Sequence, residues 1–230
     1  MAKGRIIFVT GTDTGVGKSY ATGVLARAYL ALGKTVITQK PVQTGTREPE
    51  DILIHRRMMG LPPDPPELLS LTCPYIFKYP AAPETAASLE GQKIDSGHLL
   101  ACLRELSQTY EVVLVEGAGG LYVPLTEDLT VLDFISLLMC PVLVVSAARL
   151  GTINHTVLTI KALKARGLYV AGLIYNLHFA TDEFLAERSL EDIKRLAEID
   201  QVLKLPNITD EIPSIEALLS FVENTPGLRP

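Results

Sequence analysis

A glycine-rich segment near the start of the chain has the residue types that bind a phosphate group. Residues 11–19 read Gly-Thr-Asp-Thr-Gly-Val-Gly-Lys-Ser; they follow an apolar run at 5–10 that is typical of a β-strand and precede a helical pattern. In this order, backbone N–H groups and the positive end of the helix dipole point at an anion. Lys18 would reach the β- and γ-phosphates of a nucleotide, and the Ser19 hydroxyl would hold Mg²⁺. The expected nucleotide contacts are Gly15, Val16, Gly17, Lys18, Ser19 and Tyr20.

The spacing of this segment departs by one residue from the usual phosphate loop. In the pattern G-x-x-x-x-G-K-[ST] the first glycine would fall at position 12, where the chain has Thr12, and Gly11 comes one residue too early. An ordinary glycine-rich turn is the alternative. We favour phosphate binding because the strand, the Gly-Lys-Ser sequence and the helix occur in the order that such a loop requires.

Two charged residues follow or close predicted strands. Lys40 comes after the run at 35–39, and Glu116 closes the buried run at 112–116. Ligands in open α/β sheets bind at the carboxyl ends of strands. Glu116 would therefore bind Mg²⁺, and Lys40 would be a fixed cation that stabilises charge on a transferred group; a structural carboxylate and a solvated lysine are the alternatives. Asp51, near a helix start, would either cap that helix or be a second Mg²⁺ ligand.

Another helix start is a second candidate anion site. Residues 151–154 read Gly-Thr-Ile-Asn and open a helical pattern, which suits a carboxylate, although a plain helix cap is an equal alternative. The four histidines have neither metal-ligand spacing nor a partnered serine or cysteine, so we expect them to be non-catalytic. They are His55, His98, His155 and His178.

The composition is that of a globular protein with a large core. The chain has 230 residues, of which 47% are hydrophobic, and a net charge of −5 without a cluster of Lys or Arg. This argues against a nucleic-acid partner. The apolar stretch at 131–150 is interrupted by charged residues and a proline, which favours a helix and a strand over a membrane span. Three widely spaced cysteines and the lack of a signal-peptide pattern predict a cytoplasmic protein.

The order of the elements predicts one doubly wound, mainly parallel β-sheet flanked by helices, in a single α/β domain over residues 1–230. We expect the proline-rich segment 61–83, with seven prolines, to be irregular over most of its length. Strands are expected at 5–10, 35–39, 112–116, 141–146, 170–176 and, as an edge strand, 202–205. Helices are expected at 21–32, 50–59, 95–110, 128–138, after 149–155, from 181 onward, and at 213–222.

Four sequence blocks together resemble the dethiobiotin synthetase family, a group of P-loop NTPases. The blocks are 11–19, 40–45, 115–120 and 150–155, and Asn176 extends the match. The first block, with the form G-T-D-T-x-V-G-K-[ST], accounts for the unusual spacing at Thr12. The resemblance implies an ATP- and Mg²⁺-dependent ligase of biotin synthesis. Such an enzyme closes a cyclic urea on 7,8-diaminononanoate with CO₂, through a carbamate that ATP phosphorylates, and releases ADP and phosphate.

The resemblance also implies roles for individual residues. Lys18 and Lys40 would stabilise the developing charge, and Thr14 and Thr44 would contact the diamine or its carbamate. Ser19, Asp51 and Glu116 would hold Mg²⁺. The remaining nucleotide contacts would be Glu116, Gly117, Ala118, Gly119, Asn176, Pro206 and Asn207. The substrate carboxylate would bind, across a homodimer interface, to Leu150, Gly151, Thr152 and Asn154.

Other functions of the same loop class remain as alternatives. Regulatory or partitioning ATPases carry a lysine early in the loop, at the position of Asp13, so the sequence disfavours them. Amidating enzymes of the cobalamin type normally add a glutamine-hydrolysing domain, for which this chain has no room. A small-molecule kinase would transfer phosphate to a stable acceptor, and its phosphate release would not depend on both a diamine and bicarbonate.

Overall fold

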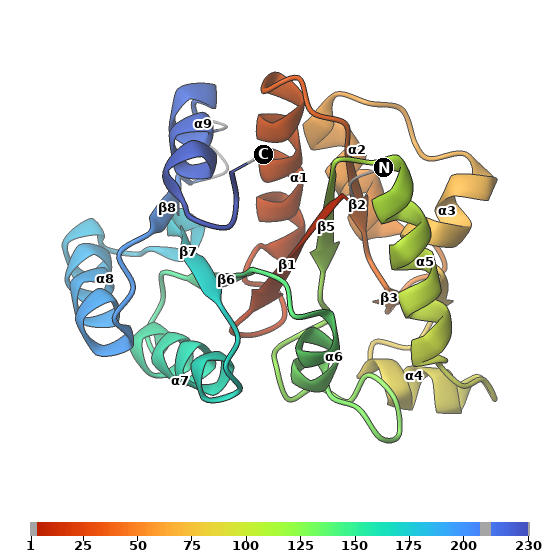
Figure 1. Cartoon of the computed structure of the whole chain (residues 1–230). Coiled ribbons are helices and arrows are strands. Elements are labelled where there is room, and N and C mark those ends of the chain that lie inside the picture. The colour runs from red at the N-terminus through yellow and green to blue at the C-terminus, as the bar shows by residue number, and fades with distance from the viewer. Residues whose placement is uncertain (1–3, 208–212, 230) are drawn as a thin grey trace.

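A six-stranded sheet lies at the centre of the computed structural model, which describes residues 4–207 and 213–229 (Figure 1). The strand order is β2-β5-β1-β6-β7-β8, and all neighbouring strands in it run parallel. The strands are β1 Arg5–Gly11, β2 Val36–Gln39, β5 Val112–Glu116, β6 Val142–Ala147, β7 Val170–Asn176 and β8 Val202–Leu205. The predicted fold class is therefore confirmed.

Helices cover both faces of this sheet. The face that includes Ile7 and Val9 packs against α1 Lys18–Ala31, α2 Glu50–Met59 and α9 Ile215–Asn224. The opposite face, which includes Phe8, packs against the remaining α-helices. These are α3 Pro66–Thr72, α4 Pro83–Leu89, α5 Ser96–Thr109, α6 Val131–Leu138, α7 Thr152–Ala165 and α8 Glu183–Ala197. A short 3₁₀ turn, η1 Leu177–Phe179, follows β7. Successive strand residues point to opposite faces, so a strand covered on both sides is apolar throughout.

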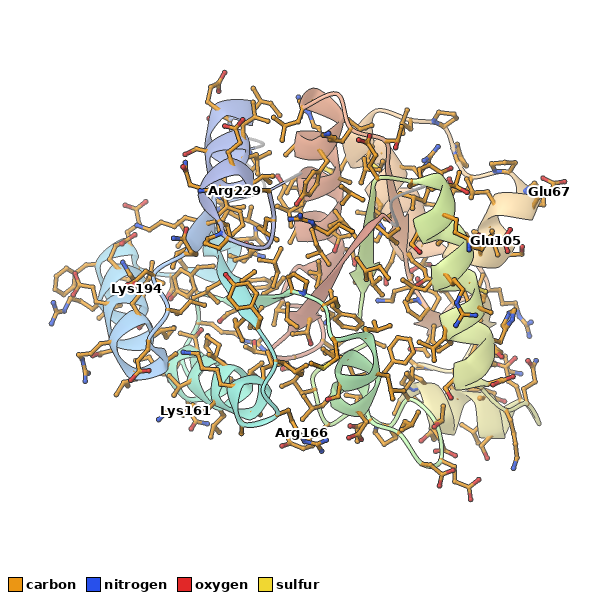
Figure 2. All side chains as sticks on the ribbon, in the orientation of Figure 1. Glu67, Glu105, Lys161, Arg166, Lys194 and Arg229 are labelled. Atoms are coloured by element: carbon orange, nitrogen blue, oxygen red, sulfur yellow. The ribbon has the colours of Figure 1, made fainter. Side chains whose placement is uncertain are left out.

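The outer surface of the helical layers carries many of the charged side chains. Figure 2 shows six of them pointing outward from the outer helices and the C-terminal segment. They are Glu67, Glu105, Lys161, Arg166, Lys194 and Arg229. Within the described ranges, no helix is both long enough and apolar enough to span a bilayer.

The proline-rich segment is irregular over most of its length, as expected, but it also contains short regular elements. It holds α3 and a short strand, β4 Tyr75–Phe77, which pairs in parallel with β3 Val42–Thr44. Prolines begin two of the helices here: Pro66 is the first residue of α3, and Pro83 is the first residue of α4. A first-turn proline costs no hydrogen bond because the N–H groups there have no partner within the helix. The prolines thus mark where helices start.

The register of the sheet brings the predicted site residues to one edge. Gln39 of β2 lies opposite Val115 of β5, so Lys40, the next residue after Gln39, stands level with Glu116. Glu116 in turn lies opposite Val9 of β1, two residues before the strand ends at Gly11. Because the strands are parallel, their carboxyl ends all open on the same side. The phosphate loop, Lys40 and Glu116 therefore meet at that edge.

A close approach between α1 and α2 sets the position of a third site element. A Cβ added to Gly23 of α1 would lie 2.7 Å from Met58 Cβ and 3.2 Å from His55 Cα, both on α2. Only a glycine leaves room for this approach. Helix α2 is thereby held against α1, and Asp51 in its first turn lies within hydrogen-bond distance of Ser19 at the end of the phosphate loop.

Candidate functional site

The phosphate loop connects β1 to α1 with the backbone geometry that its glycines permit. Gly15 and Gly17 have φ angles of 72° and 98°, a left-handed conformation that disfavours residues with a side chain. At position 17 a side chain would also clash with a neighbour, because a Cβ on Gly17 would lie 2.3 Å from Asn176 Nδ2. That same Nδ2 donates to the main-chain oxygen of Val16 at 3.0 Å. The loop is therefore held in place by β7 as well as by its own helix.

Lys18 is a buried cation at the base of this loop. Its Nζ donates to the main-chain oxygen of Asp13 at 2.8 Å. Burial, followed by the nearby charge of Lys40, lowers the pKa of Lys18 to about 8. A phosphate group would offset both effects, because an adjacent anion favours the charged form of an amine. The position thus suits a nucleotide phosphate.

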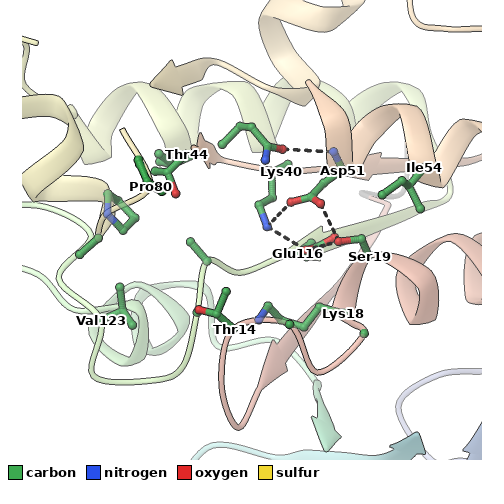
Figure 3. A pocket seen from close by; sticks show the side chains of 18 of the residues that line it. Thr14, Lys18, Ser19, Lys40, Thr44, Asp51, Ile54, Pro80, Glu116 and Val123 are labelled. Carbon is green, nitrogen blue, oxygen red and sulfur yellow. Dashed lines mark hydrogen bonds and ion pairs between the residues drawn. The ribbon is translucent and has the colours of Figure 1, made fainter. Parts of the chain in front are cut away.

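A second lysine lies between two carboxylates. Lys40 Nζ is 2.6 Å from Asp51 Oδ2 and 2.7 Å from Glu116 Oε1. It also donates to the Gly117 main-chain oxygen at 3.3 Å. The Ser19 hydroxyl lies 2.7 Å from Asp51 Oδ1 and 3.0 Å from Glu116 Oε1, and its single hydrogen serves one of them at a time. Figure 3 shows this network.

The charges in this network stabilise one another. Burial alone would disfavour the charged form of Lys40, but Glu116 and Asp51 outweigh it and raise the pKa of Lys40 above its ordinary value. Burial likewise opposes charge on Glu116, whereas Lys40 and His55 hold the pKa of Glu116 well below its usual range. Buried charges that are paired in this way remain ionised. The site therefore presents a fixed cation and two carboxylates.

One residue of the network was not identified from the sequence. His55 is fully buried, and its Nε2 lies 2.7 Å from Glu116 Oε2. The sequence predicts that the four histidines are non-catalytic, and it does not predict that one of them contacts a site carboxylate. The available signal was its spacing: His55 follows Asp51 by four residues, which puts the two on one face of α2. Gln43 was missed as well; its Oε1 accepts from the Asp51 N–H at 3.2 Å.

The phosphate loop, Lys40 and the two carboxylates line one cavity of about 830 Å³, a volume typical of ligand sites. The close-up shows Thr14 and Lys18 on one side of the cavity, and Thr44 and Lys40 on the other (Figure 3). Thirteen of the residues expected at the site line it. They are Thr14, Gly15, Gly17, Lys18, Ser19, Tyr20, Lys40, Thr44, Asp51, Glu116, Ala118, Gly119 and Asn176.

Four expected nucleotide contacts lie behind or beside that lining. Val16 is buried, and Gly117 donates its N–H to the Val9 main-chain oxygen. Pro206 and Asn207 follow the edge strand β8, and Asn207 Oδ1 lies 2.8 Å from His178 Nδ1. The His178 N–H in turn donates to Asn176 Oδ1 at 3.1 Å. These contacts connect the end of β8 to the cavity through Asn176.

The turn at 150–154 does not line this cavity. Leu150 has a relative exposure of 103%, and Asn154 is exposed as well. Thr152 is buried, with its hydroxyl 2.8 Å from Ser146 Oγ. Arg149, just before the turn, is 2.9 Å from the carboxylate of Asp13 in the phosphate loop. The turn therefore lies near the loop without lining the cavity of its own chain.

The donor set at the start of α1 fits a hard divalent cation. A hydroxyl and two carboxylates, from Ser19, Asp51 and Glu116, converge within hydrogen-bond distance of one another. Mg²⁺ prefers oxygen ligands, and at nucleotide sites it uses one or two carboxylates together with phosphate oxygens. In the part of the chain that the structure describes, no group of three or more His, Cys, Asp or Glu side chains could hold a metal. A cation here would take its remaining ligands from water and from phosphate oxygens.

The chain is similar to a family model and to several curated proteins. The model, described as an AAA domain, matches residues 5–214. The ATP-dependent dethiobiotin synthetase BioD of Chlorobaculum tepidum is 42% identical over 192 residues, which cover 83% of this chain and 80% of that protein. The ATP-dependent dethiobiotin synthetase BioD 2 of Haemophilus influenzae is 41% identical over 186 residues, or 80% of this chain and 97% of that protein.

Two solved structures share the fold at low sequence identity. The signal recognition particle receptor FtsY from Elizabethkingia anophelis in complex with GDP has a TM-score of 0.54 and 16% identity, covering 96% of this chain and 64% of that chain. The MinC:MinD cell division protein complex of Aquifex aeolicus has a TM-score of 0.55 and 15% identity, covering 94% and 86%. At such identities the likeness concerns the fold alone.

Replacing Lys40 by methionine tests the buried network. The change leaves the buried Glu116 and the half-buried Asp51 without their cation, so the free energy of unfolding should fall by about 3–5 kcal/mol, as measured by urea denaturation. Lys93→Met is the matched control, because Lys93 and Glu127 are 3.7 Å apart with side chains 92% and 80% exposed. The control should change little. Similar small losses in both variants would contradict a structural role for the Lys40 ion pairs.

Proposed function

The chain belongs to the family of ATP-dependent dethiobiotin synthetases, and from this premise we propose how its residues divide the work of the reaction. In this reaction one amine of 7,8-diaminononanoate adds to CO₂ and loses a proton, which gives a carbamate. The carbamate oxygen takes the γ-phosphoryl group of ATP, and ADP leaves. The second amine then attacks the carbonyl carbon of the resulting carbamic–phosphoric anhydride. Phosphate departs, the amine loses its proton, and the five-membered cyclic urea closes.

The observation that carries this proposal is that two differently held lysines face one cavity. Lys18 rests on a main-chain oxygen, whereas Lys40 is fixed between two carboxylates. We propose that Lys18 contacts the γ-phosphate and that Lys40 stabilises negative charge on the carbamate and the transferred group. Charge stabilisation by groups that are already in place lowers a barrier without a cost of reorganisation. The cavity volume of about 830 Å³ supports binding of a nucleotide phosphate beside a second substrate.

The proposed contacts to the diamine come from two threonines. Thr14 lies in the phosphate loop and Thr44 at the end of β3, and both line the cavity. Their hydroxyls can donate to a carbamate oxygen or accept from an amine. Between them they would hold the reacting end of the substrate beside the γ-phosphate. Such positioning of the two reactants would supply a large part of the rate.

Magnesium is proposed to bind with ATP at Ser19, Asp51 and Glu116. The convergence of their oxygens supports this. When bound, Mg²⁺ would neutralise charge on the β- and γ-phosphates. The carboxylate oxygens that would hold that cation are those that now contact Lys40 and Ser19, so Lys40 would keep fewer ion-pair contacts and more of its charge would face the substrate.

The proposed adenine contacts are Asn176, Pro206 and Asn207. Asn176 already donates one N–H to Val16 and accepts from His178, which leaves one N–H of its amide for the base. Lys204, where the family usually has glycine, lies 2.6 Å from Glu187, so its charge is already partnered.

A cytoplasmic location is also proposed. The free cysteines Cys73, Cys102 and Cys140 support it.

A homodimer is proposed in which the turn at 150–154 binds the substrate carboxylate of the neighbouring subunit. The full exposure of Leu150 supports this, together with the exposed side chains of Leu158 on α7 and of Tyr122. Sedimentation velocity would test it against the chain mass of 25.0 kDa. We expect a species of twice that mass, and Leu150→Glu should shift it to the monomer. A monomeric wild-type protein would contradict the shared site.

The competing functions are less well supported. The loop position at which partitioning ATPases carry a lysine is occupied by Asp13, whose carboxylate pairs with Arg149. The fold shared with the MinC:MinD complex does not bear on activity at 15% identity. A small-molecule kinase would need only one acceptor group in the cavity, whereas threonines lie on two sides of it.

The proposed reaction predicts a product that no kinase or switch ATPase forms. Purified protein with ATP, Mg²⁺, 7,8-diaminononanoate and ¹³C-bicarbonate should yield a cyclic urea with one ¹³C atom, detected by mass spectrometry, together with equal amounts of ADP and phosphate. Omitting the diamine or chelating Mg²⁺ should abolish phosphate release. If phosphate appears equally fast without the diamine, the ligase function is wrong for this chain.

A further inference from the structure

We propose that His55 is a positioning residue for the reaction: it fixes the Glu116 carboxylate so that one oxygen stays directed at Ser19 and the phosphate loop. His55 itself touches neither the cavity nor a reacting atom, and it acts through Glu116 alone. The inference rests on the proposed function of Ser19, Asp51 and Glu116 as Mg²⁺ ligands. It assigns a role to a side chain that the reaction described above does not use.

The two oxygens of Glu116 have separate partners. Oε2 lies 2.7 Å from His55 Nε2, while Oε1 lies 2.7 Å from Lys40 Nζ and 3.0 Å from Ser19 Oγ. An ionised carboxylate only accepts hydrogen bonds, so His55 Nε2 must carry the hydrogen and donate it. Rotation of the carboxylate would break the His55 contact and the contacts to Oε1 together. His55 therefore fixes the orientation of the group from its buried side.

Two residues of helix α2, Asp51 and His55, contact the same network. Asp51 and His55 are four residues apart and therefore lie on one face of this helix. Asp51 reaches Lys40 and Ser19, and His55 reaches Glu116 one turn further on. The close packing of α2 on α1 at Gly23 holds the helix at the required distance. One rigid element thus positions both carboxylates relative to Ser19.

The chemistry of the imidazole argues against a role in packing alone. His55 is 0% exposed, and of its two ring nitrogens Nδ1 has no hydrogen-bond partner among the described residues. A hydrocarbon side chain would fill the space without leaving a buried nitrogen unpaired. The imidazole instead provides a hydrogen-bond donor, Nε2, held rigidly 2.7 Å from Glu116 Oε2. That donor is used on Glu116 and nowhere else among the described residues.

The contact would persist when the site is loaded. Lys40 and Ser19 share Oε1 with any cation that binds there, so their hydrogen bonds to Glu116 must weaken or rearrange. His55 bonds the other oxygen and does not compete. Partners of this kind, which orient a ligating side chain from behind, typically change metal affinity or activity about 10–100-fold when removed.

The test compares three substitutions by the affinity of Mn²⁺ for the protein saturated with a non-hydrolysable ATP analogue, measured by electron paramagnetic resonance. His55→Gln places an amide nitrogen where Nε2 lies and should bind Mn²⁺ nearly as well as the wild type. His55→Asn is polar but one methylene too short, and His55→Leu is apolar. Both should bind Mn²⁺ about 10–100-fold more weakly. Affinity for the analogue without metal should stay close to that of the wild type in all three.

Two controls separate this inference from its premise. His98→Leu removes an exposed histidine of α5 and should not change Mn²⁺ affinity. Glu116→Gln should weaken Mn²⁺ binding; if it does not, the proposed metal site and the role of His55 both fail. If Glu116→Gln weakens binding but His55→Asn and His55→Leu do not, only the role of His55 is overturned. Equal losses in His55→Gln and His55→Asn would overturn it too, and this pair decides the matter if His55→Leu does not fold.

Discussion

The ion pairs of Lys40 with Asp51 and Glu116 are the interaction on which the rest of the site depends. A buried amine, the buried Glu116 carboxylate and the half-buried Asp51 carboxylate are tolerated together because each offsets the cost of burying the others. Their short distances fix three chain segments that are far apart in sequence: the end of β2, the start of α2 and the end of β5. Ser19 joins the same carboxylates and so connects the phosphate loop to them. The parallel sheet makes this meeting possible because it brings the strand ends to one edge.

The two lysines have different electrostatic surroundings, so the two sides of the cavity differ in how strongly they favour an anion. Lys18 rests on a neutral carbonyl, and its lowered pKa reflects burial and the nearby cation. Lys40 has a raised pKa because two carboxylates surround its amine. The first position therefore favours an incoming anion more strongly than the second. Nucleotide phosphate and metal would arrive at one side of the network, and the charge of Lys40 would become available for the second substrate as its carboxylates are drawn toward the metal.

Much of this could be predicted from the sequence because it rests on strong patterns. Apolar runs followed by Lys40 or closed by Glu116 read as buried strands, and the rule for parallel sheets then placed both residues beside the loop. Asp51 stayed ambiguous, since a carboxylate at a helix start serves as a cap equally well. The three-residue strands β3 and β4 are too short to show a period, and the prolines concealed the starts of α3 and α4. His55 was missed because its function depends on how closely α2 packs on α1. Gly23 permits this close packing, but a single glycine in a helical pattern does not predict it.

A crystal structure with a non-hydrolysable ATP analogue, Mg²⁺ and the diamine tests the central claim most directly, namely that the carboxylates of this network exchange Lys40 for a metal when the substrates bind. The account predicts Mg²⁺ in contact with Ser19, Asp51 and Glu116, with Lys40 directed at the γ-phosphate or the carbamate. A structure in which Lys40 still lies between the two carboxylates, and Mg²⁺ binds elsewhere, would contradict it.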